Sequence, residues 1–303
     1  MIALAGVSKR FGQRWAVNDL NLEVGAGEIF GLLGHNGAGK STAIGMMLGQ
    51  VWPTQGQIRI CGYDVGNARQ HALREVGAMF ETPAFYDYLS GWRNLEMLSH
   101  YTAPTAPQRI RQVLDWVGLT GRECSKVKTY SHGMRARLAL AQALLPAPRL
   151  LILDEPSDGL DPEGIHEMRH TILRLHDELG LTILLSSHFL NEVEQLCTRI
   201  AVLRQGHKVF DGTLDDVKRA HQWVRLRTSD FAEAVRLLRS HQMLADERDG
   251  QYLSLANGIE TDAVVRRLVE HGMPVYEIAR TEQTLENFYM ALMKEHPPGM
   301  AAN

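Results

Sequence analysis

The chain is poor in cysteine, and its three cysteines, Cys61, Cys124 and Cys197, never stand in a CxxC pair. An odd number of widely separated cysteines is not the framework of a disulfide-stabilised protein, and their spacing does not fit a zinc ribbon. We expect each to be a small, buried, apolar residue. The 303 residues, 45% of them hydrophobic, are enough for one large domain and a smaller one.

Long apolar runs are also missing. A bilayer-spanning helix needs about 18 consecutive apolar residues, and the richest stretch, residues 138–153, is interrupted by Gln142, Pro146 and Arg149. Residues 1–12 have too short an apolar segment, with no basic region before it, for a secretory signal. We expect a cytosolic chain that does not cross a membrane by itself.

The chain has no excess of basic residues, because 32 Lys and Arg stand against 35 Asp and Glu, for a formal net charge of −3. A strong positive field is therefore absent. This balance disfavours nucleic acid as a partner.

Hydrophobic patterning predicts an α/β core with a mainly parallel sheet. Residues 2–30 alternate apolar and polar residues between glycines, which is typical of strands joined by turns. Short continuous apolar runs, typical of strands buried on both faces, then alternate with helical patterns. These runs are residues 29–34, 150–154, 182–187 and 199–206, and residues 86–145 are mostly helical in spacing.

The pattern changes after the last of these runs. From about Gln222 the sequence predicts the order strand, helix, strand, strand, helix, strand, which is that of a ferredoxin-like α+β domain. A helix over residues 283–294 follows, and residues 295–303 are expected to form a flexible tail. We predict a first domain over residues 1–215 and an accessory domain over residues 222–294.

The segment GHNGAGKS satisfies the pattern GxxxxGK[ST] between an apolar strand and a helical pattern. Its glycines let consecutive backbone N–H groups converge on phosphate oxygens, and the following helix presents its positive end. Lys40 is expected to neutralise charge on the β- and γ-phosphates, and the Ser41 hydroxyl to ligate Mg²⁺. The residues expected to bind the nucleotide here are Gly34, His35, Asn36, Gly37, Ala38, Gly39, Lys40, Ser41 and Thr42.

Two carboxylates, Asp154 and Glu155, follow the apolar run LLIL. The strand delivers them at its carboxyl end, where ligands bind in open α/β sheets. We expect Asp154 to hold the Mg²⁺ shell and Glu155 to orient and polarise the attacking water.

These motifs stand beside YSHGMRARLALAQALL, LLILDEPSDGLDP and LLSSH. Over about residues 1–215 the sequence resembles the nucleotide-binding subunit of an ATP-binding cassette (ABC) transporter, whose motifs occur in this order. The resemblance implies a P-loop NTPase cassette with an N-terminal antiparallel β-region and a helical subdomain over about residues 86–145. It implies hydrolysis of ATP with Mg²⁺, at two sites shared across a homodimer.

The resemblance also assigns roles outside the phosphate-binding segment. The family's signature loop contacts the γ-phosphate of ATP held by a second copy, a role that falls here to Ser131 and Gly133. Asp161 matches the loop that links the two sites, and His188 matches the histidine that senses the γ-phosphate. Phe11 matches the aromatic residue that stacks on adenine.

The chain departs from the family pattern in two places. The signature loop usually reads Leu-Ser-Gly-Gly-Gln, so Tyr130, His132 and Met134 are changes, and we expect altered contact without loss of activity. Where the family usually has a glutamine contacting Mg²⁺ and water, this chain has Glu81. A carboxylate still ligates Mg²⁺, and the same variant resembles exporters of the bacitracin-resistance type.

The C-terminal part resembles the small appendix of many drug-exporter ATPases. Together the resemblances imply an ATPase that lies on the inner face of the cell membrane and energises export through a separate integral membrane permease. Residues 82–90, with Phe85, Tyr86 and Tyr88, are our hypothesis for the surface that grips the permease, and an ordinary core is the alternative. The sequence does not name the cargo.

The sequence also contains features of three other kinds of protein. His166, Glu167 and His170 form a literal HExxH, as in zinc proteases, but no third ligand or downstream glycine turn accompanies it, so a polar helix face is favoured. The segment GHNGAGK is also similar to the ATPase that serves copper-site maturation of nitrous oxide reductase. A soluble ABC ATPase acting on nucleic acid or ribosomes is the alternative to transport, and the short interval between Lys40 and Ser131 leaves no room for the long coiled coil of many such proteins.

Overall fold

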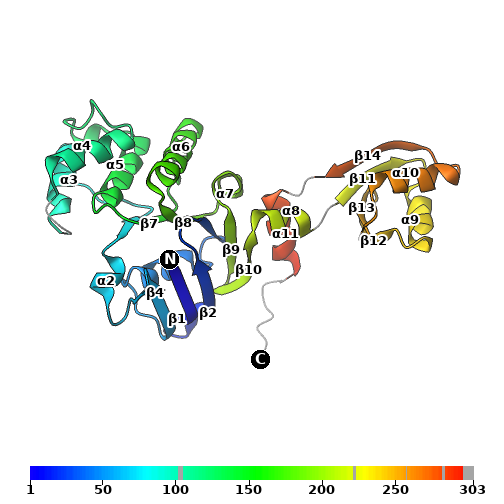
Figure 1. Cartoon of the computed structure of the whole chain (residues 1–303), viewed down its shortest axis with the longest axis horizontal. Coiled ribbons are helices and arrows are strands. Elements are labelled where there is room, and N and C mark those ends of the chain that lie inside the picture. The colour runs from blue at the N-terminus through cyan, green and yellow to red at the C-terminus, as the bar shows by residue number, and fades with distance from the viewer. Residues whose placement is uncertain (102–104, 221–222, 257, 282–283, 296–303) are drawn as a thin grey trace. The chain divides into compact units, whose positions relative to one another are not determined.

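The structure, a computed structural model, describes residues 1–101, 105–220, 223–256, 258–281 and 284–295 (Figure 1). The chain divides into two compact units, Met1–Gly212 and Thr213–Asn303. Each unit has its own hydrophobic core.

A six-stranded sheet forms the centre of the first unit, in the order β10-β9-β3-β8-β7-β6. The pairs β6-β7, β7-β8, β3-β8 and β3-β9 are parallel, so the carboxyl ends of these strands meet at one edge. Every residue of β3, β7 and β8 is buried, which explains their continuous apolar runs. The bounds are β3 Ile29–Leu33, β6 Val76–Met79, β7 Leu150–Asp154, β8 Thr182–Ser187, β9 Arg199–Arg204 and β10 His207–Thr213.

Each of the fully buried strands β3, β7 and β8 is followed by a helix. These helices are α1 (Lys40–Met47) after β3, α6 (Pro162–Leu179) after β7 and α7 (Leu190–Leu196) after β8. Helix α6 ends at Gly180, whose φ of 63° is in the left-handed region that favours glycine.

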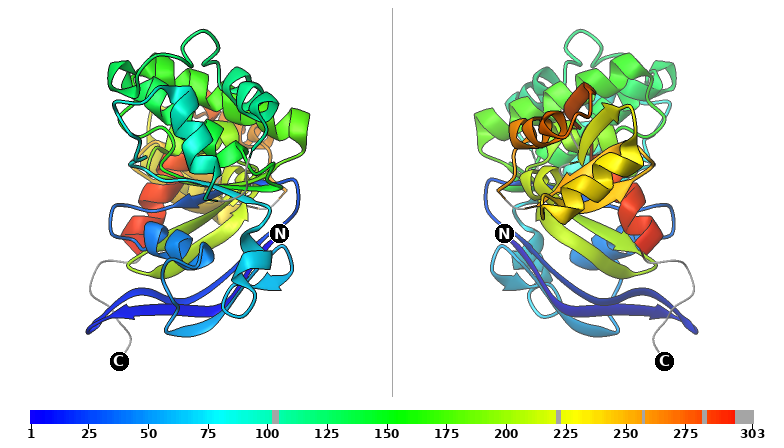
Figure 2. Two further views of the ribbon diagram at one scale, coloured as in Figure 1. Left: turned by 90° about the vertical axis from the view of Figure 1, so that its left-hand side faces the viewer. Right: turned by 90° about the vertical axis from the view of Figure 1, so that its right-hand side faces the viewer.

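An antiparallel sheet in the order β2-β1-β4-β5 opens the chain, as the family resemblance implied. Its buried side chains share one core with α1 and with the central sheet. The long β1–β2 ribbon lies at the end of the first unit opposite α3, α4 and α5 (Figures 1 and 2). The bounds are β1 Ile2–Phe11, β2 Arg14–Val24, β4 Gln55–Ile60 and β5 Tyr63–Asp64, followed by the short α2, Arg69–Leu73.

The helical subdomain consists of α3 (Gly91–Ser99), α4 (Pro107–Trp116) and α5 (His132–Leu144). Tyr130, one of the departures from the family's signature loop, is buried here, and its hydroxyl donates a hydrogen bond to the Arg122 carbonyl at 2.8 Å. This tyrosine thus anchors the segment that enters α5.

The second unit contains a four-stranded sheet in the order β12-β13-β11-β14. The chain runs β11, α9, β12, β13, α10, β14, so the ferredoxin-like prediction is confirmed. The bounds are β11 Trp223–Thr228, α9 Phe231–Ser240, β12 Leu244–Arg248, β13 Tyr252–Leu255, α10 Thr261–Glu270 and β14 Val275–Thr281.

Two further helices belong to this unit, and the sequence predicted only one of them. Helix α11 spans Leu285–Glu295, so Glu295 belongs to a helix and not to the expected tail. The rest of that tail, residues 296–303, lies outside the described residues. Helix α8, Leu214–Ala220, was not predicted, and it packs against α11.

The cysteine expectation holds for one residue of three. Cys197 is buried, Cys61 is half-buried and Cys124 is exposed. Cys124 follows the exposed residues Gly121 and Arg122 in the loop between α4 and α5, where no apolar periodicity forces it inward.

Candidate nucleotide-binding site

The loop between β3 and α1, here called the phosphate loop (residues 34–39), is shaped by its glycines. Gly39 has a φ of 111°, and a Cβ atom there would lie 2.5 Å from the carbonyl oxygen of Ala16. Only glycine fits both the conformation and the space. The loop therefore passes directly into α1, whose first backbone N–H groups have no partner within the helix. That arrangement is a ready site for phosphate oxygens.

Lys40, the first residue of α1, is 5% exposed. Its Nζ donates to the Gly34 carbonyl at 2.6 Å and lies 3.0 Å from Oε1 of Glu155. The ammonium is thereby held between the phosphate loop and the end of β7.

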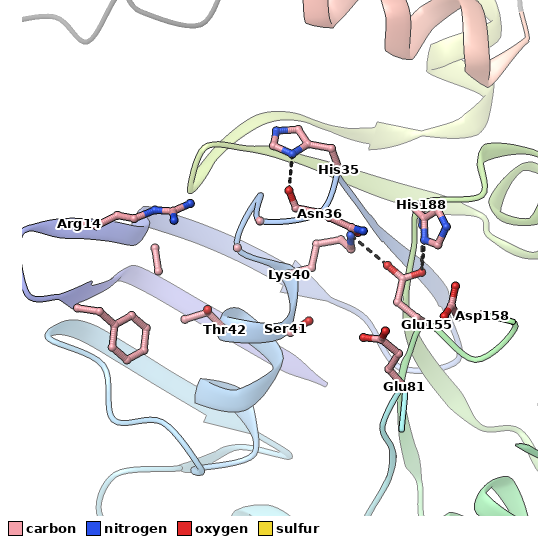
Figure 3. Close-up of a pocket in the computed structure, with 14 residues that line it drawn as sticks. Arg14, His35, Asn36, Lys40, Ser41, Thr42, Glu81, Glu155, Asp158 and His188 are labelled. Atoms are coloured by element: carbon pink, nitrogen blue, oxygen red, sulfur yellow. Dashed lines mark hydrogen bonds and ion pairs between the residues drawn. The ribbon is translucent and has the colours of Figure 1, made fainter. Parts of the chain in front are cut away.

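Glu155 takes its position from an unusual backbone. Its φ is 50°, which is uncommon for a residue with a Cβ atom, and its N–H donates to the carbonyl and hydroxyl oxygens of Ser186 at 3.2 and 3.1 Å. Its Oε2 lies 2.8 Å from Nδ1 of His188 and accepts the backbone N–H of His188 at 3.2 Å. Glu155 is therefore fixed between Lys40 and His188, as Figure 3 shows.

Asp154, Ser41 and Glu81 supply oxygen donors near this carboxylate. Asp154 ends β7, is 5% exposed, and accepts a hydrogen bond from the Ser186 hydroxyl at 2.5 Å. Ser41 and Glu81 line the same pocket as Glu155. Hard oxygen donors of this kind suit Mg²⁺, so the donor set fits the expected ion.

The phosphate loop, Lys40 and Glu155 lie at an open pocket of about 630 Å³, the size of a small-molecule site. It contains eleven of the residues expected from the sequence: Phe11, His35, Asn36, Gly37, Gly39, Lys40, Ser41, Thr42, Glu81, Glu155 and His188. Gly34, Ala38 and Asp154 are buried and lie outside the lining.

Arg14, Ala16 and Asp158 also line the pocket, and no sequence motif predicted them. Arg14 starts β2, and its guanidinium reaches the phosphate loop, where Nη2 lies 3.8 Å from the place a Cβ of Gly37 would occupy. Phe11 at the end of β1 is 53% exposed, and Nζ of Lys9 lies 4.9 Å from the centre of its ring. An exposed aromatic ring at the pocket suits stacking on a base. Arg14 stands three residues after Phe11, and this proximity is the sequence feature from which its place in the pocket could have been predicted.

Ser131, Gly133 and Asp161 lie outside this pocket. The exposed Ser131 is the N-cap of α5, where its hydroxyl accepts the N–H of Met134 at 3.2 Å. Asp161 caps α6 by accepting the N–H of Gly164 at 2.9 Å. Ser131 and Gly133 thus lie at the positive end of α5 and outside the lining of this pocket.

The two histidines of the HExxH pattern lie together on α6, with ring centroids 4.4 Å apart. However, Nδ1 of His166 lies 2.8 Å from Arg169 Nη2, and Glu167 pairs with Arg137 at 3.4 Å. Within the described part of the chain, no group of three or more His, Cys, Asp or Glu could hold a metal ion. His166 and Glu167 of the HExxH pattern therefore interact with neighbouring arginine side chains.

The same part of the chain has no helix that combines the length and the apolar composition of a membrane span.

Comparison with known proteins gives the same family along nearly the whole chain. Residues 17–158 match the family model described as ABC transporter. The chain is 37% identical over 300 residues to the uncharacterized ABC transporter ATP-binding protein YhcH of Bacillus subtilis, covering 97% of this chain and 96% of that protein. It is 36% identical over 297 residues to the bacitracin transport ATP-binding protein BcrA of Bacillus licheniformis, covering 97% of each chain.

A solved structure described as the ATP-binding subunit of an ABC transporter superposes with a TM-score of 0.65 at 30% identity, covering 73% of this chain and 92% of that one. The phosphate loop, the carboxylates after β7 and His188 therefore stand in the setting of a known nucleotide-binding fold. The chain belongs to the family of ABC transporter ATP-binding proteins.

Proposed function

We propose that this protein hydrolyses ATP and uses the resulting closure and opening of a homodimer to drive export through a separate membrane permease. The observation that carries the proposal is the constellation of Lys40, Glu155 and His188 beside a phosphate loop in one pocket. Export is favoured because the chain is 38% identical over 214 residues to the Nod factor export ATP-binding protein I of Burkholderia lata, covering 70% of each chain.

In the proposed reaction, the phosphate loop binds the β- and γ-phosphates through its backbone N–H groups, and Lys40 moves its charge from Glu155 to the phosphates. The freed Glu155 then orients the attacking water and accepts its proton. His188, already within hydrogen-bond distance of Glu155, contacts the γ-phosphate and keeps the carboxylate in place.

A bound Mg²⁺ would be held by Ser41, Asp154 and Glu81 and would neutralise charge on the phosphates. Phe11 would stack on the adenine ring.

In the proposed homodimer, the signature loop of each copy contributes to the nucleotide site of the other copy. Ser131 and Gly133 lie at the start of α5, outside their own pocket, so a γ-phosphate bound by a partner copy is the ligand that this helix end suits. Asp161 lies in the loop that would link the two sites, while its carboxylate caps α6.

The permease would dock on residues 82–90, on the inner face of the membrane. Tyr86 and Tyr88 are 38% and 66% exposed, and their rings are 5.9 Å apart. Phe85 is half-buried beside them. Exposed aromatic side chains of this kind are enriched at protein interfaces.

The test is steady-state ATP hydrolysis by the purified chain with Mg²⁺, alone and after co-purification with detergent-solubilised membrane proteins, alongside Glu155→Gln. Glu155-dependent hydrolysis and an integral membrane protein in equal amount are expected. Glu155→Gln with wild-type turnover would refute the mechanism. Intact hydrolysis that responds to DNA or ribosomes would instead favour a non-transport ABC ATPase.

A further inference from the structure

Several direct contacts join the ends of β7 and β8 at the proposed catalytic centre, among them the N–H of Glu155 on both oxygens of Ser186. The Ser186 hydroxyl donates to Asp154, and His188 contacts the carboxylate of Glu155. These contacts set the catalytic carboxylate against its histidine. They do not fix the backbone that continues beyond each residue.

A further connection runs through Glu192, which belongs to neither strand. Glu192 lies in the first turn of α7 and is 4% exposed. Its Oε1 accepts a hydrogen bond from the hydroxyl of Ser157, and its Oε2 accepts one from the hydroxyl of Ser187 at 3.1 Å. One carboxylate thus bridges the segment after Glu155 and the segment before His188.

Both serines are 1% exposed, so the bridge is shielded from water. The Ser187 hydroxyl also accepts the backbone N–H of Phe189 at 3.0 Å, so this hydroxyl is bonded on both sides. Because each hydroxyl has a buried acceptor in a fixed place, Ser157 and Ser187 are held in one rotamer each. Their backbones lie two residues after Glu155 and one residue before His188.

A carboxylate in this position is costly. Burial raises the pKa of Glu192, the hydrogen bonds from Ser157 and Ser187 partly oppose this, and the negative charge of Glu155 raises the pKa further. An apolar side chain of similar size would fill the space without this penalty. An apolar side chain could not, however, accept one hydrogen bond from each of the two serine hydroxyls.

We infer that Glu192 is a positioning residue that holds the loops bearing Glu155 and His188 in register for ATP hydrolysis. The inference rests on the proposed function, because it concerns the same reaction. Glu192 touches neither the phosphate loop nor Lys40 in any contact that the described residues make. Its removal therefore affects turnover and spares nucleotide binding.

The experiment measures kcat, KM for ATP and the Kd of a fluorescent ATP analogue for wild type, Glu192→Ala, Glu192→Gln, Ser157→Ala and Glu155→Gln. Glu192→Ala is expected to lower kcat by about ten- to a hundredfold, since small misplacements of catalytic groups have effects of this size. Ser157→Ala, which removes one arm and little volume, lowers kcat less. Glu192→Gln keeps an oxygen and a nitrogen on the two hydroxyls and restores most of the turnover. In Glu192→Ala, Glu192→Gln and Ser157→Ala, the Kd of the ATP analogue is expected to change by less than about twofold.

Glu194→Ala is the matched control, because Glu194 lies on the same helix but makes no contact with either serine. It keeps the wild-type kcat. Wild-type turnover in both Glu192→Ala and Ser157→Ala overturns the inference, and so does a parallel loss of kcat, nucleotide affinity and thermal stability without rescue by Gln. Wild-type hydrolysis that does not depend on Glu155 overturns the proposed function as well, so the two failures are distinguishable.

Discussion

Nζ of Lys40 lies 3.0 Å from Oε1 of Glu155, and both side chains are more than nine-tenths buried. The cation that is expected to serve the phosphates is thus paired with the carboxylate that is expected to serve the water. Such a pair compensates two buried charges, and removing one partner leaves the other uncompensated. In the proposed reaction, the phosphates of ATP would therefore compete with the carboxylate of Glu155 for the same ammonium group.

Glu155→Gln tests this competition. A neutral amide takes no proton from water, so kcat is expected to fall by at least about a hundredfold. The amide also releases Lys40 to the phosphates, so the affinity for ATP is unchanged or higher. Turnover is measured as phosphate release, and affinity by equilibrium binding. Glu178→Gln, an exposed change near the end of α6, is the control and retains both values. A joint loss of affinity and turnover would contradict the competition.

Phe11→Ala tests the adenine contact. Loss of one stacking ring is expected to weaken ATP binding by about five- to a hundredfold, because base–aromatic stacking is worth about 1–3 kcal/mol. Phe11→Trp keeps a stacking face and should retain affinity. Tyr63→Ala removes another exposed aromatic side chain, one outside the pocket lining, and serves as the control. Equal affinity in Phe11→Ala and wild type would exclude the stacking role.

The parts of the site that the sequence predicted are those set by local pattern. The phosphate loop follows a continuous apolar strand, and Asp154 and Glu155 follow another, so strand burial and parallel pairing bring them together. Arg14 and Asp158 carry no such pattern. They reach the pocket because β1–β2 and the loop after β7 fold toward it, which is a tertiary effect.

Glu192 shows the same limit more clearly. It is separated from Ser157 by 35 residues, and its first-turn position in α7 reads as a favourable helix end. Only the fold reveals that its carboxylate is buried between two hydroxyls. Helix α8 was missed for a related reason, since seven residues are too few for helical periodicity to emerge.

The double substitution Phe85→Ala, Tyr86→Ala tests the permease surface. It should lower transport in membrane vesicles while sparing basal ATP hydrolysis by the isolated chain. The backbone of Tyr86 is held by the buried Asn94, which accepts its N–H at 2.8 Å and donates to its carbonyl at 3.1 Å, so removal of the ring leaves the loop in place. Tyr101→Ala, at an exposed tyrosine outside residues 82–90, is the control. Unchanged transport in the double variant would reject this surface.

The three cysteines should differ in reactivity toward an aromatic disulfide reagent at pH 8. Cys124 is exposed and reacts first. Burial raises the pKa of Cys61, and the charge of Glu75 raises it further, so this half-buried thiol reacts more slowly. Burial also raises the pKa of Cys197, which should react only after denaturation. Mass spectrometry of the modified peptides gives the order, and Cys124→Ser should abolish the fast phase. Rapid labelling of Cys197 in the native chain would contradict this order.

The raised pKa of Glu192 predicts how stability depends on pH. The folded chain holds this proton to a higher pH than the unfolded chain, whose value is close to 4.5. Between these two pKa values the folded state binds more protons, so the contribution of Glu192 to the free energy of unfolding falls as pH rises. The glutamine in Glu192→Gln does not titrate in this range. The free energy of unfolding of this variant relative to wild type should therefore be higher at pH 8 than at pH 4.5.

Urea unfolding of both chains at the two pH values measures this difference. Any constant effect of the amide on packing or hydrogen bonding cancels, because only the change in the difference between the chains is compared. Glu194→Gln, at a position on the same helix, should show the same difference from wild type at both pH values. A Glu192→Gln difference that does not change with pH would mean that Glu192 titrates alike in the folded and unfolded chains, which its burial between Ser157 and Ser187 argues against.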